Sequence, residues 1–369
     1  MSKLTRSVWA EVNLQDIAFN TQQIRRLIGD SQLMAVVKAN AYGHGALEVA
    51  HTVLANGASW LAVAIPEEGV RLRRAGIAAP ILVLGAVGPE EVEVCVAKDL
   101  AVTLYEPQIA RILANTARKL QKAAKVHIKV DTGMSRLGIP DGAAVEFIRS
   151  VARLPGIEVQ GVFTHFADAE NPNQEYLHWQ WQRFERVIAT LKRDGVHIPC
   201  CHAANTAATL FFPESHLDMV RVGLGLYGMY PNGRSSIPLK PALSLKTRIA
   251  ALKRVPAGTP VSYGCTYVTW KDTTLAVLPI GYADGLSRKL SNIGHVLIAG
   301  QPCPIVGKVT MDHTIVDVDH LPVSVGDEVV LIGSSGQTKI TADDWARWMD
   351  TINYEVTCLI SSRVERVYT

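Results

Sequence analysis

A short apolar run ends on a lysine in the stretch Leu33-Met34-Ala35-Val36-Val37-Lys38-Ala39-Asn40-Ala41-Tyr42-Gly43-His44-Gly45, and a turn with two glycines follows the lysine. Apolar runs of this length are typical of strands that are buried on both faces of a sheet. Lysine is almost never fully buried without a partner, so Lys38 either reaches solvent at the strand end or lies in a pocket for chemistry. In a pocket, desolvation lowers the pKa of the amine and frees its lone pair to form a Schiff base. The spacing alone leaves both interpretations open.

Seven further apolar runs follow residues 33–37 along the first two-thirds of the chain. They cover residues 60–64, 80–84, 101–104, 126–130, 159–164, 198–201 and 219–224. One expected helix, at residues 13–27, precedes the first run; between the runs, helices are expected at 141–154 and 173–193, and two more begin at Pro66 and Pro89. Buried strands that alternate with helices in this way, eight in number over roughly 240 residues, predict an α/β fold with a TIM-type (β/α)₈ barrel. A doubly wound open sheet is the alternative.

The pattern of apolar runs and helices ends at residues 231–238, which have the composition of a linker. Short alternating segments then follow at residues 243–251, 274–279, 295–298, 315–318 and 328–332. Two helix-like segments at 341–349 and 353–361 precede a closing strand at 363–368. We therefore expect the barrel in residues 1–235 and a mainly antiparallel β domain in residues 236–369.

Composition excludes several classes of protein. The 369 residues are 48% hydrophobic and 19% charged, as in a folded globular chain with room for two domains. A formal net charge of +3 without a block of Lys or Arg argues against nucleic acid as a partner. The first residues lack the apolar core of a signal peptide, and no apolar run reaches the roughly 18 residues of a membrane span, so the sequence predicts a cytoplasmic protein without a membrane partner. The six cysteines show no C-x-x-C spacing and predict neither a disulfide framework nor a metal site.

Polar residues cluster where the predicted strands end. They are Lys38, Arg136, His165, Thr206, Arg221 and Gly223. Each has a structural explanation by itself, since His165 could be a satisfied core histidine, Arg221 a surface cation and Thr206 part of a helix cap. Together they fall at the catalytic end of one barrel, with the hydroxyl and the glycine after strands seven and eight, where such barrels bind phosphate.

Several segments resemble those of one enzyme family. The motif AVVKANAYGHG at residues 35–45 is similar to the pyridoxal-phosphate lysine motif of alanine racemases. The segments IKVDTGMSRLG, THFADAE, VRVGLGLYG, VSYGCTYVTW, GYADG, VGKVTMD and TINYEVTCLISSRVERVY resemble bacterial alanine racemases in the same order. The resemblance covers essentially the whole chain, including the second domain.

The resemblance implies a cofactor site. Lys38 would form the internal aldimine with pyridoxal 5'-phosphate, Arg221 would face the pyridine nitrogen with His165 hydrogen-bonded to it, and Arg136 would lie beside the phenolate. The groups that would hold the phosphate come from Tyr42, Thr206, Gly223, Leu224 and Tyr354.

The resemblance also implies a homodimer with shared active sites. Tyr263 and Met311 would reach the site of the other subunit from the second domain, and Tyr282 would line the substrate entrance beside Arg136 and Met311. Lys129 matches a lysine that is carbamylated in many members, where it orients the arginine at Arg136. One departure from the family is Leu286-Ser287, where an aromatic–proline pair is common, and it could alter the range of substrates.

The chemistry supports the same function. Inverting an α-carbon requires an acid–base group on each face, and Tyr263 is the candidate opposite Lys38. Neighbouring cations would favour the phenolate form of this tyrosine. An arginine at the pyridine nitrogen leaves that nitrogen unprotonated, and the resulting weaker electron sink suits racemisation better than transamination.

The predicted function is interconversion of L-alanine and D-alanine, which would supply D-alanine for peptidoglycan. A racemase of wider range, acting on serine or lysine, is the closest alternative. A non-catalytic pyridoxal-phosphate carrier would need no second domain. A basic-amino-acid decarboxylase would have an acidic partner for the ring and, commonly, a Cys-Asp pair in its second domain.

Overall fold

The computed structural model describes residues 6–234, 236–319 and 321–369. The chain forms two compact units, one made of residues 16–41 and 46–240 and the other of residues 1–15, 42–45 and 241–369. The expected boundary at residues 235 and 236 includes residue 235, which lies outside the described residues. The strand near the N-terminus, which the sequence analysis placed with the barrel, pairs within the second unit.

The first unit is a closed barrel of eight parallel strands. They are β2 (Gln32–Val36), β3 (Trp60–Val63), β4 (Ile81–Val83), β5 (Ala101–Leu104), β6 (Ala124–Asp131), β8 (Ile157–Phe163), β9 (Cys201–His202) and β10 (Met219–Val222). Strand β2 pairs with both β3 and β10, and a β5–β6 pairing closes the ring. The barrel prediction is confirmed, and the open-sheet alternative is excluded because no strand of the ring is an edge.

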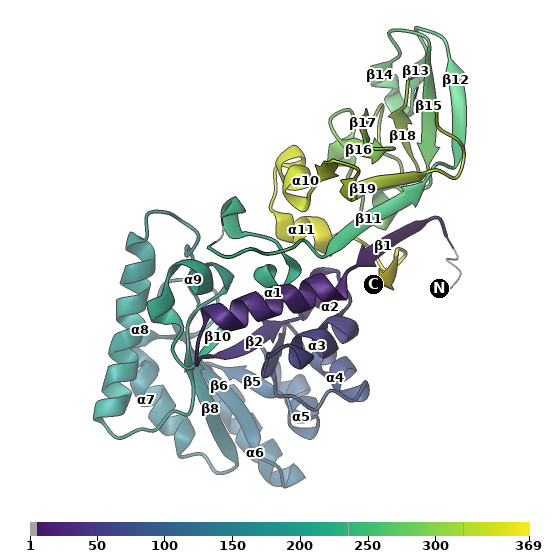
Figure 1. The fold of residues 1–369 in the computed structure, drawn as a ribbon. Coiled ribbons are helices and arrows are strands. Elements are labelled where there is room, and N and C mark those ends of the chain that lie inside the picture. The colour runs from purple at the N-terminus through teal and green to yellow at the C-terminus, as the bar shows by residue number, and fades with distance from the viewer. Residues whose placement is uncertain (1–5, 235, 320) are drawn as a thin grey trace. The chain divides into compact units, whose positions relative to one another are not determined.

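Helices lie outside this ring of strands (Figure 1). They are α1 (Leu14–Leu27), α3 (Ala46–Ala55), α4 (Pro66–Arg74), α5 (Val92–Ala97), α6 (Pro107–Leu120), α7 (Asp141–Ala152), α8 (Glu175–Arg193) and α9 (Thr206–Phe211). Helix α6 shows why they pack there, since Ile109, Leu113 and Ala117 recur at helical spacing and are buried. Burying a side chain such as Leu113 contributes about 2 kcal/mol to folding.

One barrel strand is shifted from its expected position. The apolar pattern predicts a strand at residues 198–201, whereas β9 is Cys201–His202. Pro199 has no backbone N–H and so cannot donate to the ladder of hydrogen bonds. The strand therefore begins after the proline and ends at His202, a residue that lies outside the expected strand.

The second unit is mainly antiparallel β structure, as predicted. Its largest sheet has the order β17-β16-β19-β11-β1-β21, with β20 on β19. These strands are β1 (Val8–Val12), β11 (Leu243–Arg248), β16 (His295–Ile298), β17 (Gln301–Pro304), β19 (Glu328–Ser335), β20 (Thr338–Ile340) and β21 (Glu365–Tyr368). The β1–β21 pair is parallel, and β1 is the strand that ties the N-terminal residues to this unit.

Two smaller sheets and two helices complete the second unit. They are β12 (Ala251–Val255), β15 (Thr273–Leu278) and β18 (Thr314–Asp317) in one sheet, β13 (Pro260–Val261) and β14 (Tyr267–Val268) in the other, and helices α10 (Ala342–Met349) and α11 (Asn353–Cys358). The segment 243–251, expected as one strand, contains β11 and the start of β12, which lie in different sheets.

Candidate active site

The backbone after β2 takes an unusual left-handed turn that begins at Lys38. Residues Ala39, Asn40, Ala41 and Tyr42 have φ between 51° and 54°. Left-handed backbone is unfavourable for residues with a Cβ, by roughly 1–2 kcal/mol each. The hydrogen bond from Ala41 N–H to Val37 O, 2.9 Å long, closes the turn. A strained turn of this kind persists only where its surroundings hold it, and such turns cluster at functional sites.

Glu68 is the side chain that holds this turn, and the sequence analysis missed it. Its Oε1 accepts a hydrogen bond from the N–H of Ala39 at 2.6 Å, and its Oε2 accepts one from the N–H of Ala64 at 2.7 Å. The carboxylate thereby ties the residue after Lys38 to the end of β3. The only signal in the sequence is the Pro66-Glu67-Glu68 helix start, which predicts a cap for α4 and says nothing of Lys38.

Arg221, on β10, is a buried cation whose partners are all neutral. Only 3% of its surface is exposed, so the interpretation as a surface cation is wrong. Its two terminal nitrogens donate to His202 Nδ1 at 2.8 Å, Thr164 O at 2.8 Å, Ala203 O at 3.0 Å and His165 Nδ1 at 3.1 Å. The predicted hydrogen bond to His165 is confirmed. Burial lowers the pKa of Arg221 to about 9, so the guanidinium is still protonated at neutral pH.

Further cations surround Arg221 at the same end of the barrel. Lys129, at 5% exposure, forms no ion pair within the described residues. Burial, and then the charges of Arg136 and Arg221, lower the pKa of Lys129 to about 8. Part of the surface of His165 reaches solvent, yet close packing and the charges of Arg221, Lys129, Arg136 and Lys38 hold the pKa of this imidazole well below its usual range. The end of the barrel thus gathers positive charge around a neutral histidine.

The residues predicted to hold phosphate in the barrel lie together after β9 and β10. Thr206 begins α9, and its Oγ1 accepts a hydrogen bond from the N–H of Gly223 at 3.2 Å. Leu224 begins the 3₁₀ helix Leu224–Tyr227 directly after that glycine. A Cβ on Gly225 would lie 3.2 Å from Thr206 Cγ2, so glycine allows the two segments to approach closely. Asn205 caps α9 by accepting from Ala208 N–H at 3.0 Å, as its position predicts.

Tyr42 and Tyr354, the other two predicted phosphate ligands, lie side by side in the second unit. Their ring centroids are 6.1 Å apart. Burial, together with the neighbouring Tyr354 and Cys358, raises the pKa of Tyr42 above its ordinary value, so its phenol is a neutral donor. A Cβ on Gly43 would lie 2.1 Å from Thr357 O, which explains the glycine after this tyrosine.

The remaining candidates, Tyr263, Tyr282 and Met311, are exposed side chains of the second unit. Tyr263 lies between β13 and β14 and is 75% exposed. The segments of Tyr282 and Met311 are joined by backbone hydrogen bonds of 3.0 Å, from Tyr282 N–H to Thr310 O and from Ala283 N–H to Met311 O. The candidate residues therefore fall into two groups, one within each unit.

The donors of these groups fit pyridoxal phosphate. This cofactor presents a phosphate, a phenolate and a pyridine nitrogen, and the residues supply hydroxyl donors, an amine and guanidinium groups. No cluster of three or more His, Cys, Asp or Glu side chains suited to a metal ion occurs in the described part of the chain. The charge of the donor set is thus matched to an anionic organic cofactor.

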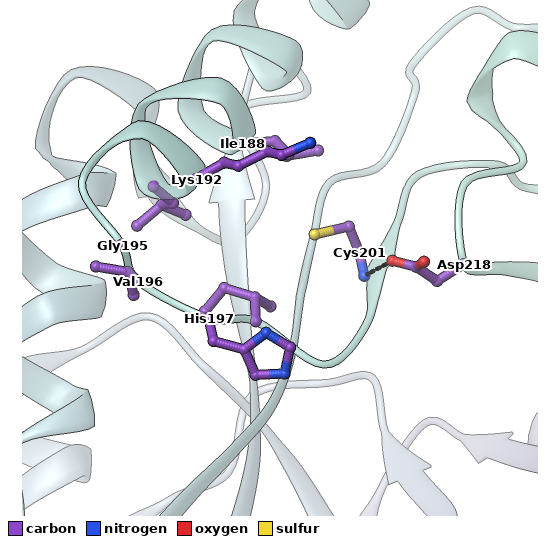
Figure 2. A pocket seen from close by; sticks show the side chains of 9 residues that line it. Ile188, Lys192, Gly195, Val196, His197, Cys201 and Asp218 are labelled. Carbon is purple, nitrogen blue, oxygen red and sulfur yellow. Dashed lines mark hydrogen bonds between the residues drawn. The ribbon is translucent and has the colours of Figure 1, made fainter.

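A pocket at the other end of the barrel is not part of this site. Figure 2 shows it between the end of α8 and the start of β9, with Lys192, His197 and Asp218 around it. The N–H of Cys201 donates to Asp218 Oδ2 at 2.7 Å across its wall. Cys201 is the first residue of β9 and Asp218 directly precedes β10, whereas Lys38 and Thr206 follow their strands. In barrel enzymes the end where strands begin serves stability and the other end carries the chemistry.

Comparison with known proteins identifies the family of the chain. The model of the alanine racemase N-terminal domain matches residues 12–231, and that of the C-terminal domain matches residues 242–368. An alanine racemase of Methanococcus maripaludis is 47% identical over 99% of both chains. The structure of an alanine racemase from Clostridium difficile has a TM-score of 0.96 and 39% identity, covering 100% of this chain and 97% of its own. A histidine racemase from Leuconostoc mesenteroides subsp. sake is also similar, with 30% identity, a TM-score of 0.92, and coverage of 100% and 99%.

Among the described residues, no helix combines the length and the apolar composition that crossing a membrane requires.

Both domain models and the full-length relatives name the same family, and the chain belongs to the alanine racemase family.

Proposed function

We propose that this enzyme interconverts L-alanine and D-alanine with bound pyridoxal phosphate. The observation that carries the proposal is the end of the barrel, where Lys38 follows β2 and a buried Arg221 is hydrogen-bonded only to neutral acceptors. Full-length similarity to alanine racemases supports the choice of substrate. The cytoplasmic location and the supply of D-alanine for peptidoglycan remain predictions.

Different residues of the site would hold different parts of the cofactor. Pyridoxal phosphate, when bound, joins to amines and stabilises negative charge at the α-carbon of an amino acid. Lys38 is the amine to which it would be attached. The groups that would bind its phosphate belong to Tyr42, Thr206, Gly223, Leu224 and Tyr354. Arg136 would neutralise the phenolate, and Arg221 would donate to the pyridine nitrogen.

Arg221 favours racemisation over other reactions of this cofactor. A carboxylate at the pyridine nitrogen would keep that nitrogen protonated and make the ring a strong electron sink. An arginine with a pKa of about 9 stays a donor at neutral pH and gives the nitrogen no proton. Racemisation needs only brief stabilisation of the α-carbon before a proton returns, and so tolerates the weaker sink.

Two residues would move the proton, one on each face of the substrate. Lys38 would serve one face, and Tyr263 would serve the other from a second copy of the chain. A side chain that is 75% exposed in one chain has room to enter another subunit. Further apolar side chains of the same unit are also exposed, namely Val268, Trp270, Ile293 and Met311. Exposed apolar groups of this kind mark interaction surfaces and support a homodimer with shared sites.

Lys129 would carry a carbamate that orients Arg136. The lysine is buried among cations and has a pKa of about 8, so a useful fraction of its amine is neutral at physiological pH. Only the neutral amine reacts with carbon dioxide. The product is an anion, which the neighbouring guanidinium groups would stabilise.

A wider range of substrates is the second candidate. The similarity to a histidine racemase supports it, because that protein shares the architecture. Leu286 and Ser287 directly follow the segment of Tyr282, which is proposed to line the entrance. Leu286 is completely buried and Ser287 is partly exposed, so Ser287 is the residue that would leave more room there than a proline.

The test resolves the chirality of products from purified protein. With L-alanine or D-alanine we expect the racemic mixture, and with L-serine, L-lysine and L-histidine much slower conversion. Comparable rates with any of the other amino acids would establish the second candidate. Loss of every reaction with the cofactor present would refute both.

Deuterated water separates the two bases. In Tyr263→Phe, general acid–base loss predicts a fall in racemisation by a factor of about 10² to 10⁴ in both directions. By the family assignment Lys38 serves D-alanine, so this variant should exchange the α-proton of D-alanine without inversion and hardly that of L-alanine. Equal exchange into both enantiomers would mean that one base reaches both faces.

A further inference from the structure

Two buried histidines extend the hydrogen bonds of Arg221 into the centre of the barrel. His202 Nδ1 accepts from Arg221 at 2.8 Å, and His202 Nε2 lies 2.8 Å from Nδ1 of His127. Both rings are completely buried, at 0% exposure. His127 lies on β6 and His202 on β9, so the chain of contacts spans the barrel interior across β8.

The charge of Arg221 determines the position of every proton in this chain. An arginine only donates, so His202 Nδ1 must be unprotonated, and a neutral His202 then carries its hydrogen on Nε2. That hydrogen points at His127 Nδ1, which must therefore be the acceptor. A neutral His127 carries its own hydrogen on Nε2. Burial first, and the charge of Arg221 second, lower the pKa of His127 to about 3 and that of His202 well below its ordinary value, so both rings are neutral.

Packing fixes the plane of each ring. A Cβ on Gly161, opposite His127 in register, would lie 2.5 Å from His127 Nδ1, so only glycine leaves room for this ring. Phe163 stacks on His202 with centroids 4.8 Å apart and planes 4° apart. Trp60 meets the His127 ring edge to face at 5.1 Å.

A purely structural core would not need this arrangement. Inward positions of such barrels are usually filled by branched apolar side chains. Here His127 Nε2 has no hydrogen-bond partner within the described residues, and an unsatisfied buried donor is unfavourable. His202, supported by His127, accepts the hydrogen bond of one terminal nitrogen of Arg221. A carboxylate in this place would cancel the charge of the guanidinium, whereas a neutral histidine does not.

We propose that His127 and His202 are positioning residues that hold Arg221 as an uncompensated cation in one orientation. All four hydrogen bonds of Arg221 use its terminal nitrogens, so its Nε–H remains the donor for the cofactor. The inference deepens the proposed function, on which the role of that donor rests. The proton positions follow from the protein alone.

The first test uses wild-type protein prepared without cofactor and labelled with ¹⁵N-histidine. His127 and His202 should each show a protonated Nε2 and an unprotonated Nδ1. Their signals should not move with pH across the neutral range, because burial and the charge of Arg221 keep both rings neutral. An Nδ1–H form or an imidazolium at His202 overturns the proposal, and this result does not depend on any racemase activity.

The second test compares two variants of nearly equal size. In His127→Asn the Oδ1 takes the place of Nδ1 and still accepts from His202, whereas His127→Leu offers no acceptor. We expect the asparagine variant to keep the His202 tautomer, the absorbance of bound pyridoxal phosphate and the wild-type kcat. The leucine variant should lose the fixed tautomer, shift the absorbance and lower kcat about 10- to 100-fold, with KM for alanine little changed.

His216→Leu is the matched control, because His216 is buried and bonds Thr209 O at 2.9 Å outside the chain of histidines. It should leave the absorbance unchanged. Equal effects of the two His127 variants, or no effect of leucine, would overturn the positioning role. If either variant fails to fold, the wild-type tautomers decide. Wild-type protein without racemase activity would instead refute the proposed function.

Discussion

Reaction of Lys129 with carbon dioxide is a prediction whose size follows from the structure. A lysine with the ordinary pKa of 10.5 has roughly one neutral amine in 3,000 at pH 7. With a pKa of about 8, roughly one Lys129 amine in ten is neutral, so the reactive form is about 300 times more abundant. Addition of bicarbonate should therefore modify Lys129 ahead of every ordinary lysine. The carbamate would replace repulsion from Arg136 and Arg221 by attraction.

The assay adds ¹³C-bicarbonate and records the carbamate carbon by NMR. The α-amino group of the chain also has a pKa near ~8 and gives its own carbamate signal. We expect the wild type to show one further protein-bound signal that Lys129→Gln lacks. Lys125→Gln is the matched control, because Lys125 lies on the same strand, is partly exposed and pairs with Asp99. Identical spectra of the wild type and Lys129→Gln at every bicarbonate concentration would refute the reasoning.

The same lysine predicts how stability depends on pH when bicarbonate is absent. Between about pH 8 and 10.5 the unfolded chain still binds a proton at Lys129 and the folded chain does not, so the free energy of unfolding rises with pH in this window. Relative to Lys129→Gln, the free energy of unfolding of the wild type should rise by about 3 kcal/mol across this window. Below the window, the difference between the two proteins should not change with pH. Urea unfolding at a series of pH values measures this gain, and a difference that falls with pH would contradict it.

Three further variants test single contacts of the site. Lys38→Ala should lose the covalent cofactor, measured by borohydride labelling, and should lose racemisation in both directions. Mixing this variant with Tyr263→Phe should restore one intact site per heterodimer. No recovery of activity after subunit exchange would place both bases in one chain. Glu68→Gln removes the charge that accepts from Ala39 N–H at 2.6 Å, and should destabilise the fold by about 1–3 kcal/mol and slow racemisation; an unchanged unfolding midpoint would exclude its role. Tyr42→Phe should weaken cofactor binding by about tenfold, read by titration of absorbance, with the overall fold unchanged by circular dichroism.

The barrel could be predicted because each of its buried strands is a short apolar run in the sequence. Parallel strands covered on both faces are continuously apolar, and seven of the eight expected runs overlap most of a strand. The eighth is displaced by the missing N–H of Pro199. The N-terminal strand β1 was missed because its residues, Val8–Val12, form their pairs with β11 and β21, more than 200 residues away.

The site could be predicted only where a residue carries its own signal. Lys38 is a charge directly after one apolar run and Arg221 is a charge inside another, and sequence reasoning finds such contrasts. His127 is one polar residue inside a run, so it was passed over as part of the strand. The left-handed turn was not predicted either, since alanines such as Ala39 and Ala41 favour right-handed helix, and the tertiary contact with Glu68 that opposes this preference cannot be read from the local sequence.

The charges at the end of the barrel explain why the site requires anionic partners. Lys38, Lys129, Arg136 and Arg221 act on one another electrostatically, and Asp131 is the one acid that raises the pKa of Lys129. The Oδ1 of that aspartate accepts hydrogen bonds from three successive backbone N–H groups, of Gly133, Met134 and Ser135, which leaves it committed to the turn before Arg136. Uncompensated cations disfavour the folded protein alone, and each anion that enters relieves part of the repulsion. A phosphate, a carbamate on Lys129 and the carboxylate of an amino acid would then bind with mutual support, so removal of bicarbonate should also weaken binding of cofactor and substrate.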